Sequence, residues 1–143
     1  MKIRVLLVDD EKDFVDVLAE RLETRDFEVS IAYNGDEAIE KIKEKEMDVV
    51  ILDVLMPGKD GIETLMEIKK IKPILEVIML TGNATVESAV EGMKIGAFDY
   101  LMKPTETKDL VAKIVKAYKR KAEQEERIRQ AEIERIMMTR GWG

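Results

Sequence analysis

The sequence predicts a doubly wound α/β domain, in which a five-stranded parallel sheet is covered by helices on both faces. Five short runs of β-branched and aliphatic residues alternate with stretches whose apolar residues recur at helical spacing. Glycine, proline and Asn-Gly turns separate these segments. Strand and helix in regular alternation are typical of this fold class.

The five predicted strands are residues 3–8, 29–33, 49–52, 77–80 and 98–102. Three of them are almost continuously apolar, as expected of parallel strands that are covered on both faces. The intervals between them predict helices, each with one apolar face toward the sheet. These faces are Phe14, Val17, Leu18 and Leu22; Ala38, Ile39 and Ile42; Ile62, Leu65 and Met66; and Val86, Ala89, Val90 and Met93.

The last helical pattern runs without Gly or Pro from Thr107 to Arg140. Its first turns carry apolar residues that could dock on the sheet, whereas residues 119–135 are mostly charged, with i, i+4 pairs such as Lys121 and Glu125 that favour a solvated helix. We therefore expect one domain at 1–120 and a helical extension at 121–143 that is too short to be a separate output domain. The extension is either solvated or packs on a second copy or a partner through a weak apolar stripe.

Composition excludes several functions. The chain has no Cys and no His, so it cannot use a disulfide, a thiolate or an imidazole. A formal net charge of -6 argues against sequence-independent nucleic-acid binding. Apolar runs are too short for a membrane span or a signal peptide. We expect a cytoplasmic protein that binds neither nucleic acid nor membrane directly.

Polar residues follow four of the predicted strands: Asp9 and Asp10, then Asp53, Thr81 and Lys103. Taken alone, Asp9 or Asp10 could be a helix N-cap. However, doubly wound sheets bind ligands at the carboxyl ends of their strands, where these side chains would meet. Neighbouring carboxylates repel unless a cation joins them, and oxygen ligands suit Mg²⁺ or Mn²⁺. The pattern predicts phosphoryl transfer onto Asp53, with Lys103 and Thr81 stabilising the phosphoryl oxygens.

Four separated motifs together resemble the receiver domain of two-component response regulators: LLVDDE at 6–11, ILDVLMPGKDG at 51–61, MLTG at 79–82 and YLMKP at 100–104. The resemblance covers about residues 1–120 and implies a flavodoxin-like sheet with strand order 2-1-3-4-5. Residues 86–90 and 96–100 are most similar to receivers attached to AAA+ transcription activators.

The resemblance implies a role for each acidic residue of the site. Asp53 would accept a phosphoryl group from a sensor histidine kinase. Asp10, Asp53 and the backbone carbonyl of Leu55 would bind Mg²⁺, and Asp9 would act through a bound water. Because Leu55 offers no hydrogen bond to a hydrolytic water, we predict slow self-dephosphorylation.

The resemblance also implies how the signal leaves the site. Lys103 would bind one phosphoryl oxygen and Thr81 would move toward another, while the ring of Tyr100 turns inward as an aromatic switch. The Lys103-Pro104 bond would be cis. An unknown downstream protein, or a second copy, would bind the face of the fourth helix, fifth strand and fifth helix, or the C-terminal helix.

Three alternatives remain open at this stage. A phosphatase of the haloacid-dehalogenase type uses a similar aspartyl nucleophile but places a second acid two residues later, where Leu55 stands. The chain could instead be a receiver fragment of a longer transcription activator. It could also be a constitutive dimerisation or scaffold module. In the favoured interpretation it is not an enzyme beyond its own phosphorylation and slow dephosphorylation.

Overall fold

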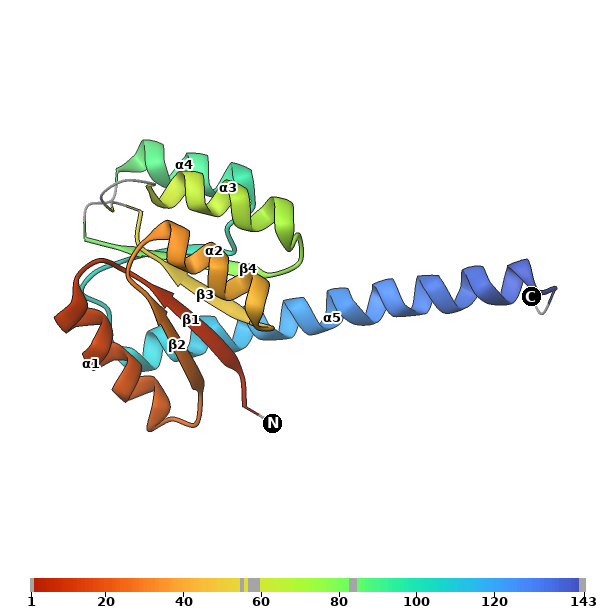
Figure 1. Cartoon of the computed structure of the whole chain (residues 1–143), viewed down its shortest axis with the longest axis horizontal. Coiled ribbons are helices and arrows are strands. Elements are labelled where there is room, and N and C mark those ends of the chain that lie inside the picture. Colours follow the sequence, from red (N-terminus) through yellow and green to blue (C-terminus); the bar gives the residue numbers. More distant parts are fainter. Residues whose placement is uncertain (1, 55, 57–59, 83–84, 142–143) are drawn as a thin grey trace.

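The computed structural model describes residues 2–54, 56, 60–82 and 85–141. Strands and helices alternate along the chain: β1 (Arg4–Val8), α1 (Lys12–Glu23), β2 (Glu28–Ala32), α2 (Gly35–Glu44), β3 (Val49–Leu52), α3 (Gly61–Ile71), β4 (Glu76–Thr81), α4 (Val86–Ile95), β5 (Asp99–Met102) and α5 (Thr107–Thr139). The five strands are parallel and form one sheet in the order β2-β1-β3-β4-β5 (Figure 1). Both the fold class and the strand order are therefore confirmed.

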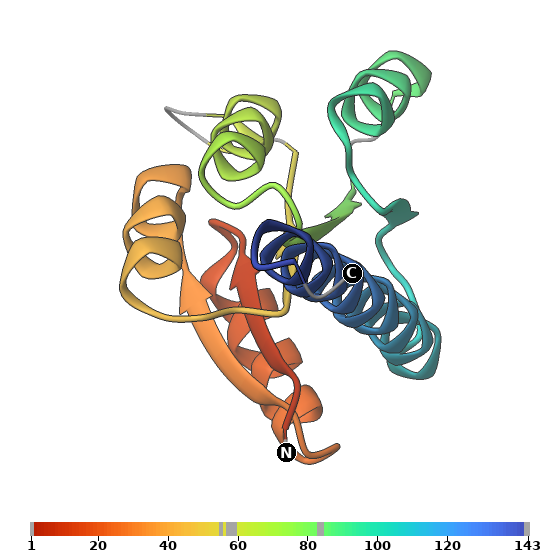
Figure 2. The same cartoon turned by 90° about the vertical axis from the view of Figure 1, so that its right-hand side faces the viewer.

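The sheet separates two apolar cores because successive side chains of a strand point to opposite faces. On β1, Leu6 and Val8 pack with residues of α2 and α3, whereas Val5 and Leu7 pack with residues of α1 and α5. Figure 2 shows α2, α3 and α4 along one side of the sheet, with α1 and α5 on the other. Strands that are buried on both faces explain the continuous apolar runs in the sequence.

Side-chain caps fix where three of the helices begin. Asn34 and Asp60 each accept a hydrogen bond from the backbone N–H three residues later, at 2.9 and 2.8 Å. Thr85 and Ser88 form a reciprocal capping box at the start of α4. Such caps satisfy N–H groups that have no partner within the helix.

Three predicted helix faces were wrong in detail. In α3, Met66 is 47% exposed, and Ile68 is buried instead. In α1, Val17 is 48% exposed and the buried residues are Val15, Leu18, Ala19 and Leu22. The buried stripe of α1 is therefore rotated toward Val15 and Ala19 and away from Val17. In α4 the predicted residues Val86, Val90 and Met93 are all exposed.

Within α4, Gly92 alone is buried. A Cβ atom at Gly92 would lie 2.6 Å from the sulfur of Met79, a residue of β4. The helix therefore contacts the core through Gly92 and through the partly buried Ile95 at its end, rather than through Val86, Val90 and Met93.

The helix α5 continues beyond the sheet as one uninterrupted element (Figure 1). Lys121, predicted to be solvated, is 5% exposed, and its Nζ lies 3.4 Å from Asp48 Oδ1 and 3.2 Å from Glu125 Oε1. Asp48 is also buried and receives three hydrogen bonds from Arg4, one from the backbone and two from the guanidinium. We call this group of Arg4, Asp48, Lys121 and Glu125 the Asp48 clamp.

A second buried carboxylate, that of Glu76, holds Arg120, the residue of α5 that precedes Lys121. Glu76, at the start of β4, pairs with both Nε and Nη2 of Arg120, and Lys69 Nζ lies 3.6 Å from Glu76 Oε1. The Arg120 guanidinium also lies 4.7 Å from the ring centre of Phe98. Helix α5 is thus bound to the amino ends of β3 and β4 at the point where it leaves the body.

Candidate functional site

Three carboxylates meet at the carboxyl ends of β1 and β3. Oxygen atoms of Asp9, Asp10 and Asp53 lie within 4.8 Å of one another. The strands are adjacent, and the Asp53 N–H donates to Val8 C=O at 2.9 Å. This bond holds the end of β1 beside the end of β3. Asp9 and Asp53 are buried, whereas Asp10 is exposed. The predicted convergence of acids distant in sequence is therefore present.

Lys103 brings a positive charge to this group. Its Nζ lies 2.7 Å from Asp9 Oδ2, 2.8 Å from Glu11 Oε1 and 3.6 Å from Asp53 Oδ2. The backbone N–H of Lys103 donates to Thr81 C=O at 2.9 Å, so the position of the residue is fixed from β4. The Lys103-Pro104 peptide bond is cis, the conformation that the resemblance implied.

Burial and hydrogen bonding act on the protonation of this pair. Burial raises the pKa of Asp9, and the bonds from Lys103 and from the Glu11 N–H only partly oppose it. Burial alone would lower the pKa of Lys103, but its hydrogen bonds to Asp9 and Glu11 raise that pKa above its ordinary value. Lys103 is therefore a stable cation at neutral pH.

Thr81 and Tyr100 lie on the neighbouring strands β4 and β5. Thr81 is fully buried at the end of β4. The ring of Tyr100 packs partly against the core, and its hydroxyl lies 3.3 Å from Ser88 Oγ on α4. Both predicted switch residues therefore border the path from the carboxylates to α4.

A glycine holds the loop after Asp53 close to the start of α3. The Gly61 N–H donates to Val54 C=O at 2.8 Å. A Cβ atom at Gly61 would lie only 2.3 Å from the Asp53 carbonyl oxygen and 2.5 Å from Val54 Cα. The close approach of the backbone therefore requires glycine at position 61, the last of the 51–61 motif.

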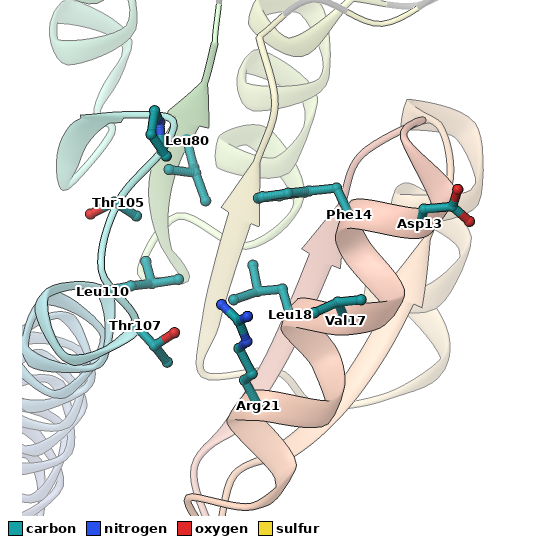
Figure 3. Close-up of a pocket in the computed structure, with 10 residues that line it drawn as sticks. Asp13, Phe14, Val17, Leu18, Arg21, Leu80, Thr105, Thr107 and Leu110 are labelled. Atoms are coloured by element: carbon teal, nitrogen blue, oxygen red, sulfur yellow. The ribbon is translucent and has the colours of Figure 1, made fainter.

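An apolar groove lies beside the site, between α1 and the segment that joins β5 to α5 (Figure 3). It measures about 400 Å³ and its walls include Phe14, Leu18, Leu80 and Leu110. The ring centre of Phe14 lies 4.3 Å from Lys103 Nζ, so one wall residue of the groove also contacts the cation of the site.

Two participants were not predicted from the sequence. Glu11 contacts Lys103, and Ser88 contacts Tyr100. Glu11 stood inside the LLVDDE motif, but no pattern indicated its partner 92 residues away. Glu11, not Asp9 or Asp10, is the N-cap residue of α1, so the simple capping interpretation of the two aspartates does not apply. Leu55, the predicted carbonyl ligand, lies outside the residues that the structure describes.

The donor set fits a hard divalent cation. Asp9, Asp10 and Asp53 offer only carboxylate oxygens, the ligands that Mg²⁺ and Mn²⁺ prefer. Asp9 Oδ1 accepts the Glu11 N–H at 2.9 Å while Oδ2 accepts Lys103. Both oxygens of Asp9 therefore already accept a hydrogen bond from the chain.

A cluster of three carboxylates beside a lysine lies at the carboxyl edge of a 2-1-3-4-5 sheet, and the loop after β1 is acidic rather than glycine-rich as a nucleotide-binding loop would be. The family model of the response regulator receiver domain matches residues 5–115, and the chain belongs to that family. As a receiver, it has a histidine kinase and downstream effectors as its general class of partners, and an acidic pocket of the kind that binds Mg²⁺.

Solved structures agree with this assignment. A CheY-like receiver domain protein from Methanospirillum hungatei JF-1 is 31% identical with a TM-score of 0.83, over 87% of this chain and 99% of that one. NtrX from Brucella abortus, in complex with ADP, is 33% identical with a TM-score of 0.82, over 88% of this chain but 29% of that one. The similarity to NtrX is consistent with the expectation that this chain is most similar to receivers attached to AAA+ activators.

A third structure matches nearly the whole chain. A response regulator from Burkholderia pseudomallei, with a phosphorylated aspartic acid, a calcium ion and citrate, is 25% identical with a TM-score of 0.76. The match covers 99% of this chain and 88% of that one.

Among the residues described for the present chain, no helix is long and apolar enough to cross a bilayer.

Proposed function

We propose that the protein is a phosphorylation-activated switch in which Asp53 accepts a phosphoryl group from a sensor histidine kinase. The observation that supports this most strongly is the meeting of Asp9, Asp10, Asp53 and Lys103 at one sheet edge. The Burkholderia pseudomallei relative with a phosphorylated aspartic acid supports the same chemistry.

The residues have distinct tasks in this proposal. A carboxylate oxygen of Asp53 attacks phosphorus, and its new P–O bond replaces the bond to the leaving group, which departs with the electron pair. A carboxylate needs no general base for this step, so the absence of His is no obstacle. Lys103 stabilises one phosphoryl oxygen as it becomes more negative. Thr81 donates a hydrogen bond to another.

Asp10, Asp53 and the Leu55 carbonyl would hold Mg²⁺, with Asp9 acting through water. When bound, the metal supplies charge neutralisation at the phosphoryl oxygens. The chain's own contribution is to hold these oxygens on adjacent strands, where mutual repulsion of the carboxylates favours uptake of a cation.

Movement of Thr81 toward the phosphoryl group would change the surroundings of Tyr100. The Tyr100 ring would turn inward, and its hydroxyl would leave the contact with Ser88. Since Ser88 lies in the first turn of α4, the change would reach the exposed residues of that helix. The altered face, made by α4, β5 and α5, would bind a downstream protein or a second copy.

The groove between α1 and the segment before α5 is the surface that a kinase would cover while presenting its phosphohistidine. It is apolar and touches Lys103 through Phe14. In this proposal the protein acts only on itself, through phosphorylation and slow dephosphorylation, and works in the cytoplasm.

Incubation with Mg²⁺ and acetyl phosphate tests the proposal by intact mass. The wild type should gain one phosphoryl group, and Asp53→Asn should gain none. Asp60→Asn is a matched control, because Asn is as good a helix N-cap as Asp and Asp60 lies in the same loop. Labelling of Asp53→Asn, or turnover of general phosphomonoesters, would favour another aspartate or the phosphatase alternative.

The same samples distinguish a switch from a scaffold. A switch should change its elution volume or partner binding after phosphorylation. A constitutive module would form a dimer that depends on residues 121–143 and is indifferent to the phosphate donor.

A further inference from the structure

Lys103 lies closer to Asp9 and Glu11, two acids of the β1–α1 turn, than to Asp53, the proposed phosphoacceptor. An ammonium group has three N–H donors. Two of them reach Asp9 and Glu11 at hydrogen-bond distances of 2.7 and 2.8 Å, whereas Asp53 Oδ2 is 3.6 Å away. The lysine that should stabilise the incoming phosphoryl group is therefore engaged elsewhere in this state.

Glu11 differs from the other two acids that contact Lys103. Its side chain is 62% exposed and makes no capping hydrogen bond to α1, although Glu11 occupies the N-cap position. It also lies outside the group of three carboxylates that fits a metal. Rotation of Glu11 into solvent would cost little, because exposed ion pairs are weak.

We propose that Glu11 is a positioning residue that acts as a latch: it holds Lys103 toward the β1–α1 turn and releases it when Asp53 accepts a phosphoryl group. This inference rests on the proposed function. Phe14 supports the held position, because its ring face lies 4.3 Å from Lys103 Nζ on the same side of the site.

The latch has a direct kinetic consequence. In this proposal the charge-assisted bond between Glu11 and Lys103 breaks as the ammonium moves from the β1–α1 turn to a phosphoryl oxygen. Removing the Glu11 charge should therefore accelerate phosphorylation by a small donor by about threefold to fivefold. The effect should depend on the presence of the Lys103 ammonium.

The test compares initial rates of phosphorylation by acetyl phosphate and Mg²⁺, followed by intact mass. Glu11→Gln should react about threefold to fivefold faster than wild type. Asp13→Asn removes the same charge from the first turn of α1 without touching the contacts of Lys103, and it should change the rate by less than about twofold. This control separates the latch from general repulsion of the anionic donor.

A double-mutant cycle identifies the group through which Glu11 acts. In a Lys103→Met background, Glu11→Gln should have no further effect on the rate. The latch is wrong if Glu11→Gln matches Asp13→Asn, or if the acceleration persists without Lys103. If instead the wild type gains no phosphate at Asp53, the proposed function fails and the latch fails with it. Thermal melts of each variant check that the fold is intact.

Discussion

The Asp48 clamp gives a stability prediction that can be worked out from its distances. Opposite charges 3.4 Å apart, as between Lys121 and Asp48, attract by about 5 kcal/mol at an effective dielectric constant of 20. Asp48→Asn removes that attraction and leaves the Lys121 ammonium buried. Loss of one partner from a buried pair costs about 3–5 kcal/mol. Because Lys121 keeps Glu125 at 3.2 Å, we expect the lower end, about 3 kcal/mol.

Urea unfolding followed by circular dichroism measures this loss, and a thermal melt should show a midpoint about 10 °C lower. Adding Lys121→Met to Asp48→Asn should recover most of the stability, since the uncompensated charge is then gone. Glu46→Gln, which alters an exposed pair with Lys72 in the same region, should cost less than about 0.5 kcal/mol. A loss below that value for Asp48→Asn, or no recovery in the double variant, would refute the reasoning.

The pH dependence of the clamp provides an independent check. Burial by itself would raise the pKa of Asp48, but the hydrogen bonds and charge of Arg4, with Lys121, hold that pKa below its ordinary value of 3.8. A carboxyl whose pKa is lower in the folded state stabilises the fold above its unfolded pKa and loses that contribution as the pH falls through the folded value. The difference in unfolding free energy between wild type and Asp48→Asn should be constant near neutral pH and shrink below 3.8.

Three further changes have expected outcomes. Gly61→Ala should destabilise the protein by more than about 3 kcal/mol in urea unfolding, because its Cβ would overlap the backbone of Asp53 and Val54. Gly92→Ala meets only the flexible end of Met79 and should cost about 1 kcal/mol in the same assay; an equal loss for both glycines would contradict this distinction. Leu55→Asn should shorten the lifetime of the phosphorylated protein, measured as the decay of the mass gain after the donor is removed, and an unchanged decay rate would exclude the proposed effect of Leu55 on the hydrolytic water.

Much of the site could be predicted because parallel strands bring all their carboxyl ends to one edge. Asp9, Asp53 and Lys103 each follow a strand that its apolar residues made visible. Their meeting therefore required only the correct strand order, which the four motifs supplied. The contacts of Glu11 and Ser88 could not be predicted, since each depends on the rotamers of side chains that meet across the fold.

Helix faces were less predictable than strands. Periodicity indicates which residues share a stripe, but α1 has Val15 and Val17 on neighbouring stripes, and the stripe with Val15 and Ala19 is the buried one. Lys121 shows a second limit. The i, i+4 pairing with Glu125 is present as predicted, but the same ammonium reaches Asp48, 73 residues earlier in the chain. Pairing within a helix does not reveal whether the helix passes over a buried acid.

The strands that end in the site begin at the base of the long helix. β1 runs from Arg4 toward Asp9, and β3 lies between Asp48 and Asp53. Each strand therefore has a residue of the acidic site just after its carboxyl end and a charged anchoring residue at its amino end. The residues that anchor α5 and those of the acidic site are separate sets at opposite ends of these strands. Transfer of helix α5 to another sheet of the same strand order would require only the charged residues at the amino ends of the strands to be transferred with it.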